Sequence, residues 1–405
     1  MSVTILVLNS GSSSIKFELF DMPQQKRLAR GLMERIGEQQ TSLSYTIGTQ
    51  PKQTLAEPIA NHEVGLQRII DVLRHAWAGA DDNPMARIGA VGHRLVHGGE
   101  AFSKTVVIDD DVIKAVEKHI DLAPLHNPAN LLGVKVARTL MPGVVQVAVF
   151  DTAFHQTMPA HAFTYAVPHE LYTSLGVRRY GFHGTSHRYV TLRAAAMLGK
   201  DASRVNLVTA HLGNGASMAA IRGGKSVDTS RGLTPLEGLV MGTRCGDIDP
   251  AVMAFLAQAR GMSVSEIDTL LNKKSGVLGI SGVSNDMRAI EEAARQGHAL
   301  AGLALDVFCY RIKKYIGAYT AVLGDVDALV FTAGIGENSD VVRERVTEGL
   351  RPLGYDLDKD KNRGARGKEL DIATPDSRAR ILIIPTNEEL MIAQDTYALA
   401  ADASR

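Results

Sequence analysis

The chain has 405 residues, more than one typical hydrophobic core holds, so two domains are expected. Its hydrophobic content of 45% and charged content of 22% are ordinary for a globular protein, and its formal net charge is +0. A neutral chain has no bulk attraction for nucleic acid or for an anionic membrane surface, so neither partner is expected.

Cysteine content and the N-terminus bear on location. Cys245 and Cys309 are the two cysteines of the chain, which argues against a disulfide framework and favours a reducing compartment. The N-terminus lacks a basic region and a long apolar stretch, so it does not resemble a signal peptide. No run of about 20 apolar residues predicts a membrane span. We therefore expect a cytoplasmic protein.

The first half of the chain alternates between short strands and helices. Ile5–Leu8 is an apolar run that meets a Gly/Ser cluster, and Ile15–Phe20 alternates in the manner of a strand, so together they predict a β-hairpin with a polar turn. Asn127 is expected to cap the helix whose first turn holds Pro128. The other elements expected here are strands at Leu43–Ile47, Ile88–His93 and Val144–Phe150, and helices at Val64–Trp77, Asp109–His119 and Pro128–Leu140.

The second half begins with the same pattern. Val205–Ala210 is apolar, a Gly/Asn turn follows, and Ser217–Ile221 resumes a strand, which repeats the order seen at Ile5–Phe20. Two copies of one unit, about two hundred residues apart, indicate a duplicated domain with its junction near Asp151. Alternating strands and helices predict an α/β fold with a partly parallel sheet. The remaining elements expected are helices at Ile290–Arg295, Ala299–Leu323 and Asn387–Ala400, and strands at Ala328–Thr332 and Ile381–Ile384.

Three turns rich in Gly, Ser and Asn each follow an apolar strand, at Asn9–Ser14, Gly213–Gly215 and Gly334–Asn338. Glycine lets a backbone approach a ligand and direct N–H groups at phosphate oxygens, and Lys16 adds a nearby cation. None of the turns has the spacing of a P-loop or of a G-x-G-x-x-G motif. One such turn alone is usually an ordinary hairpin, but three at strand ends favour phosphate binding.

Charged side chains also stand at strand ends. Arg94 follows a buried strand, where it suits a carboxylate or phosphate ligand or an ordinary salt bridge. Arg231 and Arg244 lie beside small residues, and several fixed arginines suit phosphoryl transfer. Asp151 ends an apolar strand, a place where catalytic carboxylates are common, although capping of the next helix is the alternative.

The histidines raise the question of a metal site. His93 and His97 are four residues apart, as are His183 and His187, a spacing that places two rings on one face of a helix. Glycines directly after His97 and His183 argue against a helix at either pair. A zinc site is therefore not favoured.

Six segments together resemble the acetate kinase family of carboxylate kinases, and they occur in the family's order across nearly the whole chain. The segments are Leu8–Phe17, Val149–His155, Tyr180–His187, His211–Gly215, Phe331–Ser339 and Pro385–Glu389.

The resemblance implies the fold shared by actin, sugar kinases and the Hsp70 ATPase domain, in which two related ribonuclease H-like α/β domains border a central nucleotide cleft. It implies a first domain of residues 1–150, completed by a C-terminal helix at about 386–405. A second domain, 151–385, would then carry most of the nucleotide site. The resemblance also implies a homodimer.

Roles for individual residues follow from the same resemblance. Asn9 and Glu388 are expected to hold Mg²⁺, partly through water, with Mn²⁺ as a substitute and Glu389 as the alternative to Glu388. Family members often carry an aromatic residue at the position of Met287, at the adenine site. The expected ATP-binding residues are Ser12, Ser14, Lys16, His211, Leu212, Gly213, Asn214, Gly215, Asp286, Met287, Arg288, Gly334, Ile335, Gly336, Glu337 and Asn338.

On the acetate side, the resemblance makes Arg94 the contact for the carboxylate, and Arg244 and His183 the stabilisers of the transferring phosphoryl group. Acetate titrates near ~4 and is already an anion at neutral pH, so Asp151 is expected to orient the Mg²⁺ shell or Arg94 rather than to accept a proton. The apolar pocket expected for the acetate methyl group consists of Val96, Leu125, Phe182 and Pro235.

The expected reaction is direct in-line transfer of the γ-phosphoryl group of ATP to acetate, giving acetyl phosphate and ADP, and its reverse. Propionate kinase is the nearest alternative, and Val96 is bulkier than the Ala often seen in propionate-preferring relatives. An ATP-binding switch of the Hsp70 or actin kind is a more remote alternative, because such a switch does not need Arg94 beside an apolar pocket. A sugar or glycerol kinase would need a true general base for its hydroxyl nucleophile.

Overall fold

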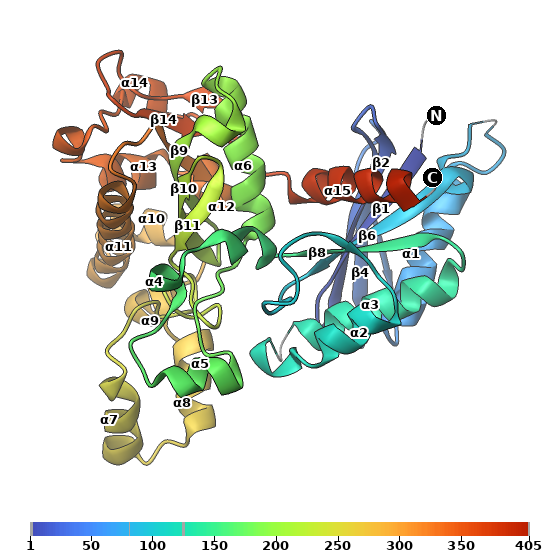
Figure 1. Ribbon diagram of the computed structural model, residues 1–405, viewed down its shortest axis with the longest axis horizontal. Helices are drawn as coiled ribbons and strands as arrows, with labels where there is room; N and C mark the ends of the chain where they lie inside the picture. Colours follow the sequence, from blue (N-terminus) through green and yellow to red (C-terminus); the bar gives the residue numbers. More distant parts are fainter. Residues whose placement is uncertain (1–2, 81, 124–125, 404–405) are drawn as a thin grey trace. The chain divides into compact units, whose positions relative to one another are not determined.

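The structure of the protein, a computed structural model, describes residues 3–80, 82–123 and 126–403. The chain divides into two compact units, each built on one β-sheet (Figure 1). The first unit comprises Met1–Phe154 and Asn387–Arg405, and the second comprises His155–Thr386. Whether the chain forms two independently folding domains with boundaries near residues 150 and 385 stays a prediction.

The first unit contains an eight-stranded sheet in the order β5-β4-β3-β2-β1-β6-β8-β7. Strands β1 to β5 form an antiparallel meander, β1, β6 and β8 run parallel, and β7 is antiparallel to β8. The bounds are β1 (Val3–Ser10), β2 (Ser14–Met22), β3 (Lys26–Glu34), β4 (Thr41–Ile47), β5 (Gln53–Glu57), β6 (Ile88–Leu95), β7 (Val106–Val107) and β8 (Val145–Phe150).

Helices cover both faces of this sheet. Because successive side chains of a strand point to opposite faces, Leu6 and Leu8 of β1 pack in the core beneath helices α1 and α3, whereas Ile5 packs against Ile392 of α15. Burial on two faces explains why β1 is continuously apolar from Ile5 to Leu8. The helices are α1 (His62–Ala76), α2 (Asp110–Glu117), α3 (Asn127–Leu140) and α15 (Glu388–Ala403), with 3₁₀ turns η1 (Pro84–Arg87) and η2 (Ile120–Leu122); η3 (Ala153–Thr157) spans the limit between the units.

The second unit contains a six-stranded sheet in the order β11-β10-β9-β12-β14-β13. Its strands β9, β10 and β11 are antiparallel, β9, β12 and β14 run parallel, and β13 is antiparallel to β14. This repeats the order β3-β2-β1-β6-β8-β7 of the first unit, so the expected duplicated α/β fold is confirmed. The bounds are β9 (Asn206–Leu212), β10 (Ala216–Arg222), β11 (Lys225–Thr229), β12 (Ala328–Thr332), β13 (Leu370–Asp371) and β14 (Arg380–Ile383).

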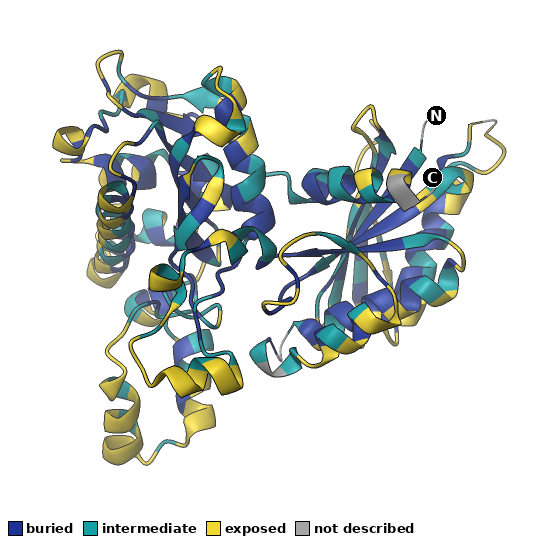
Figure 2. Ribbon diagram, in the orientation of Figure 1, coloured by how far each residue is buried: buried dark blue, intermediate teal, exposed yellow. Residues whose placement is uncertain are grey.

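The long helix α11 covers one face of the second sheet. Its residues Phe308 and Ile312 belong to the same buried cluster as Val208 and Ala210 of β9, and Figure 2 shows the central strands of both sheets as mostly buried. The helices of this unit are α4 (Ala160–Phe163), α5 (His169–Leu175), α6 (Gly184–Met197), α7 (Ala251–Arg260), α8 (Val264–Lys273), α9 (Gly276–Ser281), α10 (Met287–Arg295), α11 (Ala299–Leu323), α12 (Ala333–Asn338), α13 (Asp340–Thr347) and α14 (Lys359–Asn362), with 3₁₀ turns η4 (Ala202–Arg204) and η5 (Arg351–Leu353). Among the described helices, none has the length and apolar character needed to cross a membrane.

The expected cap of α3 is wrong. Asn127 is the first helical residue, and His126 holds the cap position but its side chain does not cap the helix. The amide of Asn127 instead accepts from the backbone N–H of His97 at 3.2 Å and donates to the carbonyl of His97 at 3.0 Å. A bond to a distant loop has displaced the local capping bond, and it fixes the backbone directly after β6.

Close approach of α15 to β6 depends on Gly92. A Cβ atom at Gly92 would lie 2.4 Å from Oγ1 of Thr396 and 2.7 Å from Cγ2 of Ile392, both on α15. We predict that Gly92→Ala destabilises the first unit by about 1–3 kcal/mol, because overpacking forces the helix outward. Urea unfolding followed by the fluorescence of Trp77, the single tryptophan, measures this unit.

The matched control removes the side chain of Thr396, whose Oγ1 is the atom nearest to the added Cβ. The double variant Gly92→Ala with Thr396→Ala should recover part of the loss, since the two positions share one contact. An unchanged urea midpoint in the single variant would contradict this account of how α15 packs.

Candidate active site

Arg94 joins four elements of the first unit at the carboxyl ends of its parallel strands. Its Nε donates to Oδ1 of Asp151 at 3.1 Å, and its Nη2 makes a second, shorter bond to Oδ2. Its Nη1 donates to Oδ1 of Asn9 at 3.3 Å, and a carboxylate oxygen of Glu388 lies 4.0 Å from Nε. Four residues expected at the site from separate segments therefore meet at one guanidinium.

Burial and charge shape this cluster. Asp151 is 1% exposed and Glu388 is about one-fifth exposed. Burial acts to lower the pKa of Arg94, but the carboxylates of Asp151 and Glu388 outweigh it and raise that pKa above its ordinary value. Burial also raises the pKa of Glu388 to about 7, against the lowering effect of Arg94. The ionised form of Glu388 is therefore costly at this buried position.

The first expected phosphate turn lies beside this cluster. Lys16 is opposite Asn9 in the pairing of β1 with β2, and its ammonium forms an ion pair with Glu389. Between the strands, the N–H of Gly11 donates to the carbonyl of Ser14 at 2.8 Å, which closes the turn. Ser12 is exposed at its tip.

The four residues expected to line an acetate pocket fall in different parts of the chain. Val96 is 4% exposed in the first unit, and its N–H donates to Oδ1 of Asn130 at 3.0 Å. Phe182 and Pro235 belong to the second unit, and Leu125 lies outside the described residues. Their assembly into one pocket stays a prediction.

A cavity of about 680 Å³ in the second unit gathers half of the expected nucleotide residues. It brings together the turn after β9, the start of α10 and the helix α12. The expected residues that line it are Gly213, Asn214, Asp286, Met287, Arg288, Gly334, Ile335 and Asn338. The sequence reasoning missed Asn285, Glu291, Ser339 and Arg366, which line it as well.

Local bonds explain how these residues are held. Asp286 caps α10 by accepting from the N–H of Arg288, and its carboxylate also pairs with the Arg288 side chain. Met287 is 4% exposed and belongs to the hydrophobic core, although it lines the cavity. Glu337 does not line the cavity, and its Oε1 accepts from the N–H of Thr386 at 3.0 Å. Gly336 and Leu212 are likewise buried away from it.

The turn Gly213–Gly215 lies against two arginines. A Cβ at Gly215 would lie 2.7 Å from Nη2 of Arg231 and 3.6 Å from Nη1 of Arg244, so glycine there leaves room for both guanidinium groups. Arg231 is buried and donates from Nε to the carbonyl of Ala216 at 3.0 Å. Burial lowers the pKa of Arg244. Positive charge is thus fixed directly beside the second of the expected phosphate turns.

Two of the expected site histidines stack on each other nearby. His183 has a left-handed backbone (φ 58°) at the N-cap of α6, and its Nδ1 lies 2.9 Å from Oγ of Ser217. Its ring stacks on that of His211 with centroids 4.0 Å apart. Nδ1 of His211 lies 2.8 Å from Oγ of Ser186. A non-glycine residue in this conformation is strained, and such strain is concentrated at functional positions.

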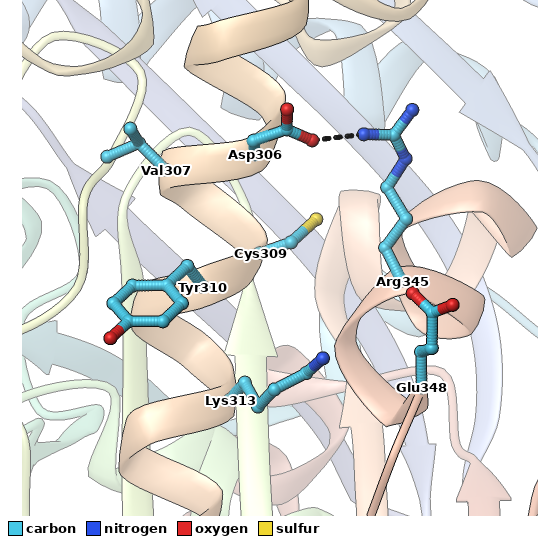
Figure 3. Close-up of a pocket in the computed structure, with 7 residues that line it drawn as sticks. All are labelled: Asp306, Val307, Cys309, Tyr310, Lys313, Arg345 and Glu348. Atoms are coloured by element: carbon cyan, nitrogen blue, oxygen red, sulfur yellow. Dashed lines mark hydrogen bonds and ion pairs between the residues drawn. The ribbon is translucent and has the colours of Figure 1, made fainter.

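A different cavity, of about 570 Å³, lies between α11 and α13 (Figure 3). Asp306 of α11 pairs with Arg345 of α13 across it. None of the described residues expected at the site lines this cavity. No group of three or more His, Cys, Asp or Glu side chains suited to a metal ion occurs in the described parts of the chain.

Comparison with known proteins identifies the family. The model of the acetokinase family matches residues 4–394. The chain belongs to the acetokinase family. It is 56% identical to a protein of Halothermothrix orenii described as acetate kinase, over 97% of this chain and 98% of that protein.

Solved structures agree with this membership. The crystal structure of Porphyromonas gingivalis acetate kinase is 50% identical and superposes with a TM-score of 0.92, covering 98% of this chain and 99% of that one. The crystal structure of a propionate kinase from Francisella tularensis is 43% identical with a TM-score of 0.91, again covering 98% and 99% of the two chains. Both enzyme names occur among relatives of the same fold.

Proposed function

We propose that this member of the acetokinase family is an acetate kinase, which transfers the γ-phosphoryl group of ATP to acetate and gives acetyl phosphate and ADP, reversibly. The observation that carries the proposal is the cavity of the second unit, where eight expected nucleotide residues converge in a chain that the family model spans almost entirely. The ATP base and ribose would lie there, with the phosphates on the Gly213–Gly215 turn.

The carboxylate substrate would pair with Arg94. Acetate is an anion at neutral pH, so the reaction needs neutralised charge rather than a general base. The two bonds from Arg94 to Asp151 support a role for Asp151 in orienting that guanidinium. Arg244 and His183 would neutralise the phosphoryl group in the transition state.

We propose that Mg²⁺ serves this reaction, with Mn²⁺ as a substitute, held by Asn9 and Glu388 partly through water. The amide oxygen of Asn9 and the carboxylate of Glu388 both lie close to Arg94. These two groups are hard oxygen ligands, and Mg²⁺ takes only a few such ligands from a protein when it also binds phosphates. Bound Mg²⁺ would neutralise phosphate charge. A cytoplasmic location is also proposed, and the free thiols of Cys245 and Cys309 support it.

Removal of either site arginine tests the proposal. We predict that Arg94→Ala and Arg244→Ala remain folded but lose roughly 10²–10³ in turnover, because each removes positive charge aimed at the reacting groups. The hydroxamate assay for acetyl phosphate measures the loss.

Two exposed arginines provide controls. Arg68 pairs with Glu57 in the first unit and Arg193 pairs with Glu369 in the second, both at the surface. Arg68→Ala and Arg193→Ala should keep wild-type turnover. Near-wild-type activity of Arg94→Ala would refute its place at the carboxylate.

Propionate is the second candidate substrate, since a propionate kinase superposes nearly as well as an acetate kinase. Val96 is buried and bulky, which supports the smaller acid. One methylene is worth only ~1–3 kcal/mol in an apolar pocket, so discrimination should be partial. We predict that kcat/KM falls in the order acetate, propionate, butyrate, and a higher value for propionate would reverse the assignment.

We also propose that the protein is a homodimer, as the family resemblance implied. An apolar stripe of α11, consisting of Leu300, Leu303, Val307 and Tyr310, supports this, with Tyr310 64% exposed. Figure 3 shows Val307 and Tyr310 on the side of α11 away from α13. Apolar stripes on a surface helix usually mark an interface.

A charge on this stripe should weaken the dimer. We predict that Leu303→Glu with Tyr310→Glu halves the mass measured by light scattering at micromolar concentration. Val264 is 83% exposed on α8 and serves as the control position, where Val264→Glu should leave the mass unchanged. A double variant that keeps the dimer mass would exclude α11 as the interface.

A further inference from the structure

Four histidines lie close together inside the second unit, and of these the proposed function gives a role in the reaction only to His183. His187 is fully buried on α6, and its ring contacts that of His155 edge-on with centroids 5.5 Å apart. The ring of His211 lies 6.2 Å from that of His187 and stacks on His183. His187 thus lies directly behind the residue expected to face the phosphoryl group.

A chain of hydrogen bonds joins His187 to His183. Oγ of Ser217, on β10, lies 2.8 Å from Nε2 of His187 and 2.9 Å from Nδ1 of His183. On its other side, Nδ1 of His187 lies 2.8 Å from Oγ1 of Thr209 on β9. The hydroxyl of Thr209 donates in turn to the carbonyl of Ala219 at 3.4 Å. Ser217 and Thr209 are both fully buried, so water does not compete for these bonds.

The carbonyl at the end of this chain sets its direction. A carbonyl only accepts, so Thr209 uses its single hydroxyl proton on Ala219 and must accept from Nδ1–H of His187. Burial lowers the pKa of His187 well below its ordinary value, and the neighbouring charges of His155, His211 and Arg231 act in the same direction. A neutral His187 with its proton on Nδ1 has a bare Nε2, which accepts the hydroxyl proton of Ser217.

Only one role then remains for Ser217 toward His183. Having donated to His187, its oxygen must accept, so Nδ1 of His183 carries a proton. We propose that Ser217, backed by His187 and Thr209, is a positioning residue that fixes a proton on Nδ1 of His183 and so lets Nε2 donate a hydrogen bond only when that ring is charged. This rests on the proposed function, in which His183 faces the phosphoryl group.

The consequence for the reaction is specific. If these hydrogen bonds ran in the opposite direction, a neutral His183 would carry its proton on Nε2 and could donate it to a phosphoryl oxygen without carrying charge. In the direction set by Ala219, a neutral ring presents a lone pair, which repels that oxygen. With Ser217 in place, His183 can therefore assist the phosphoryl group only in its charged form. Ser217 also holds the plane of that ring against His211.

The proton positions are measured directly on the whole protein without substrate. Magic-angle-spinning ¹⁵N NMR of histidine-labelled protein distinguishes the two neutral tautomers by the shifts of the ring nitrogens. The signal of His183 is the one lost in His183→Gln. We expect the Nδ1–H tautomer when the ring is neutral, and an Nε2–H tautomer in the wild-type protein would overturn the proposal.

Kinetics test the positioning role. Ser217→Ala should lower kcat in the hydroxamate assay by about tenfold, with KM for acetate and for ATP little changed, because it frees the ring of His183 without removing a substrate contact. Ser226→Ala is the matched control. Ser226 is also fully buried, and its Oγ lies 2.7 Å from Nδ1 of His155, so it removes the same group from a pair that does not bond His183.

The outcomes separate this inference from the proposed function. An equal loss of kcat in Ser217→Ala and Ser226→Ala would assign the effect to packing and overturn the inference. Full activity in His183→Gln would remove His183 from the reaction, which refutes the proposed role, while the tautomer measured for the ring would still decide the direction of the chain. The wild-type NMR measurement does not depend on whether any serine variant folds.

Discussion

The buried pairing of Arg94 with Asp151 is the interaction on which the candidate site of the first unit depends. Asp151 is 1% exposed, and Arg94 supplies two bonds to its carboxylate while also reaching Asn9. A buried carboxylate that lost this partner would be left with an uncompensated charge, which is far more costly than the pair itself. The pair therefore fixes the ends of β1, β6 and β8 relative to one another, and it brings the start of α15 to the same place through Glu388.

The two units use one strand order for different chemistry. At the ends of β1, β6 and β8 the first unit presents charged side chains and an amide that suit a carboxylate and a hard cation. At the corresponding ends of β9 and β12 the second unit presents the Gly213–Gly215 turn and the helix α12, which replaces the turn expected at Gly334–Asn338, and both border a cavity. Duplication supplied two equivalent sheet edges, and the two edges carry different side chains at their strand ends.

The regular parts of the fold could be predicted because their sequence signals are local. Strands β1, β8 and β12 are mostly apolar, and the repeat of strand, turn and strand in the amino-acid pattern is enough to indicate the duplication. Strand β3 was missed because Lys26, Arg27 and Arg30 interrupt its alternation, although it pairs with β2 on one side and β4 on the other. The cap at Asn127 was predicted wrongly because its competing bonds reach His97, thirty residues away.

The site residues that could be predicted from the sequence are those that stand in recognisable motifs. The turn residues and Arg94 stand in recognisable segments, whereas Asn285 and Arg366 line the nucleotide cavity without a motif of their own. The chain from Thr209 through His187 to Ser217 depends on three elements that only the folded sheet brings together. No local pattern in the sequence carries that information.

Return of the chain to the first unit at α15 has a consequence for synthesis. Helix α15 covers Ile5, Val7 and Phe20, yet it leaves the ribosome only after all of residues 155–386. The second unit is therefore complete while the first still exposes one apolar face of its sheet to solvent or to chaperones. Glu388 arrives with the same helix, so a nascent chain that ends before it lacks both the cover of its core and one of the residues proposed to bind Mg²⁺. Emergence of α15 thus closes the core and supplies the metal-side carboxylate in a single step.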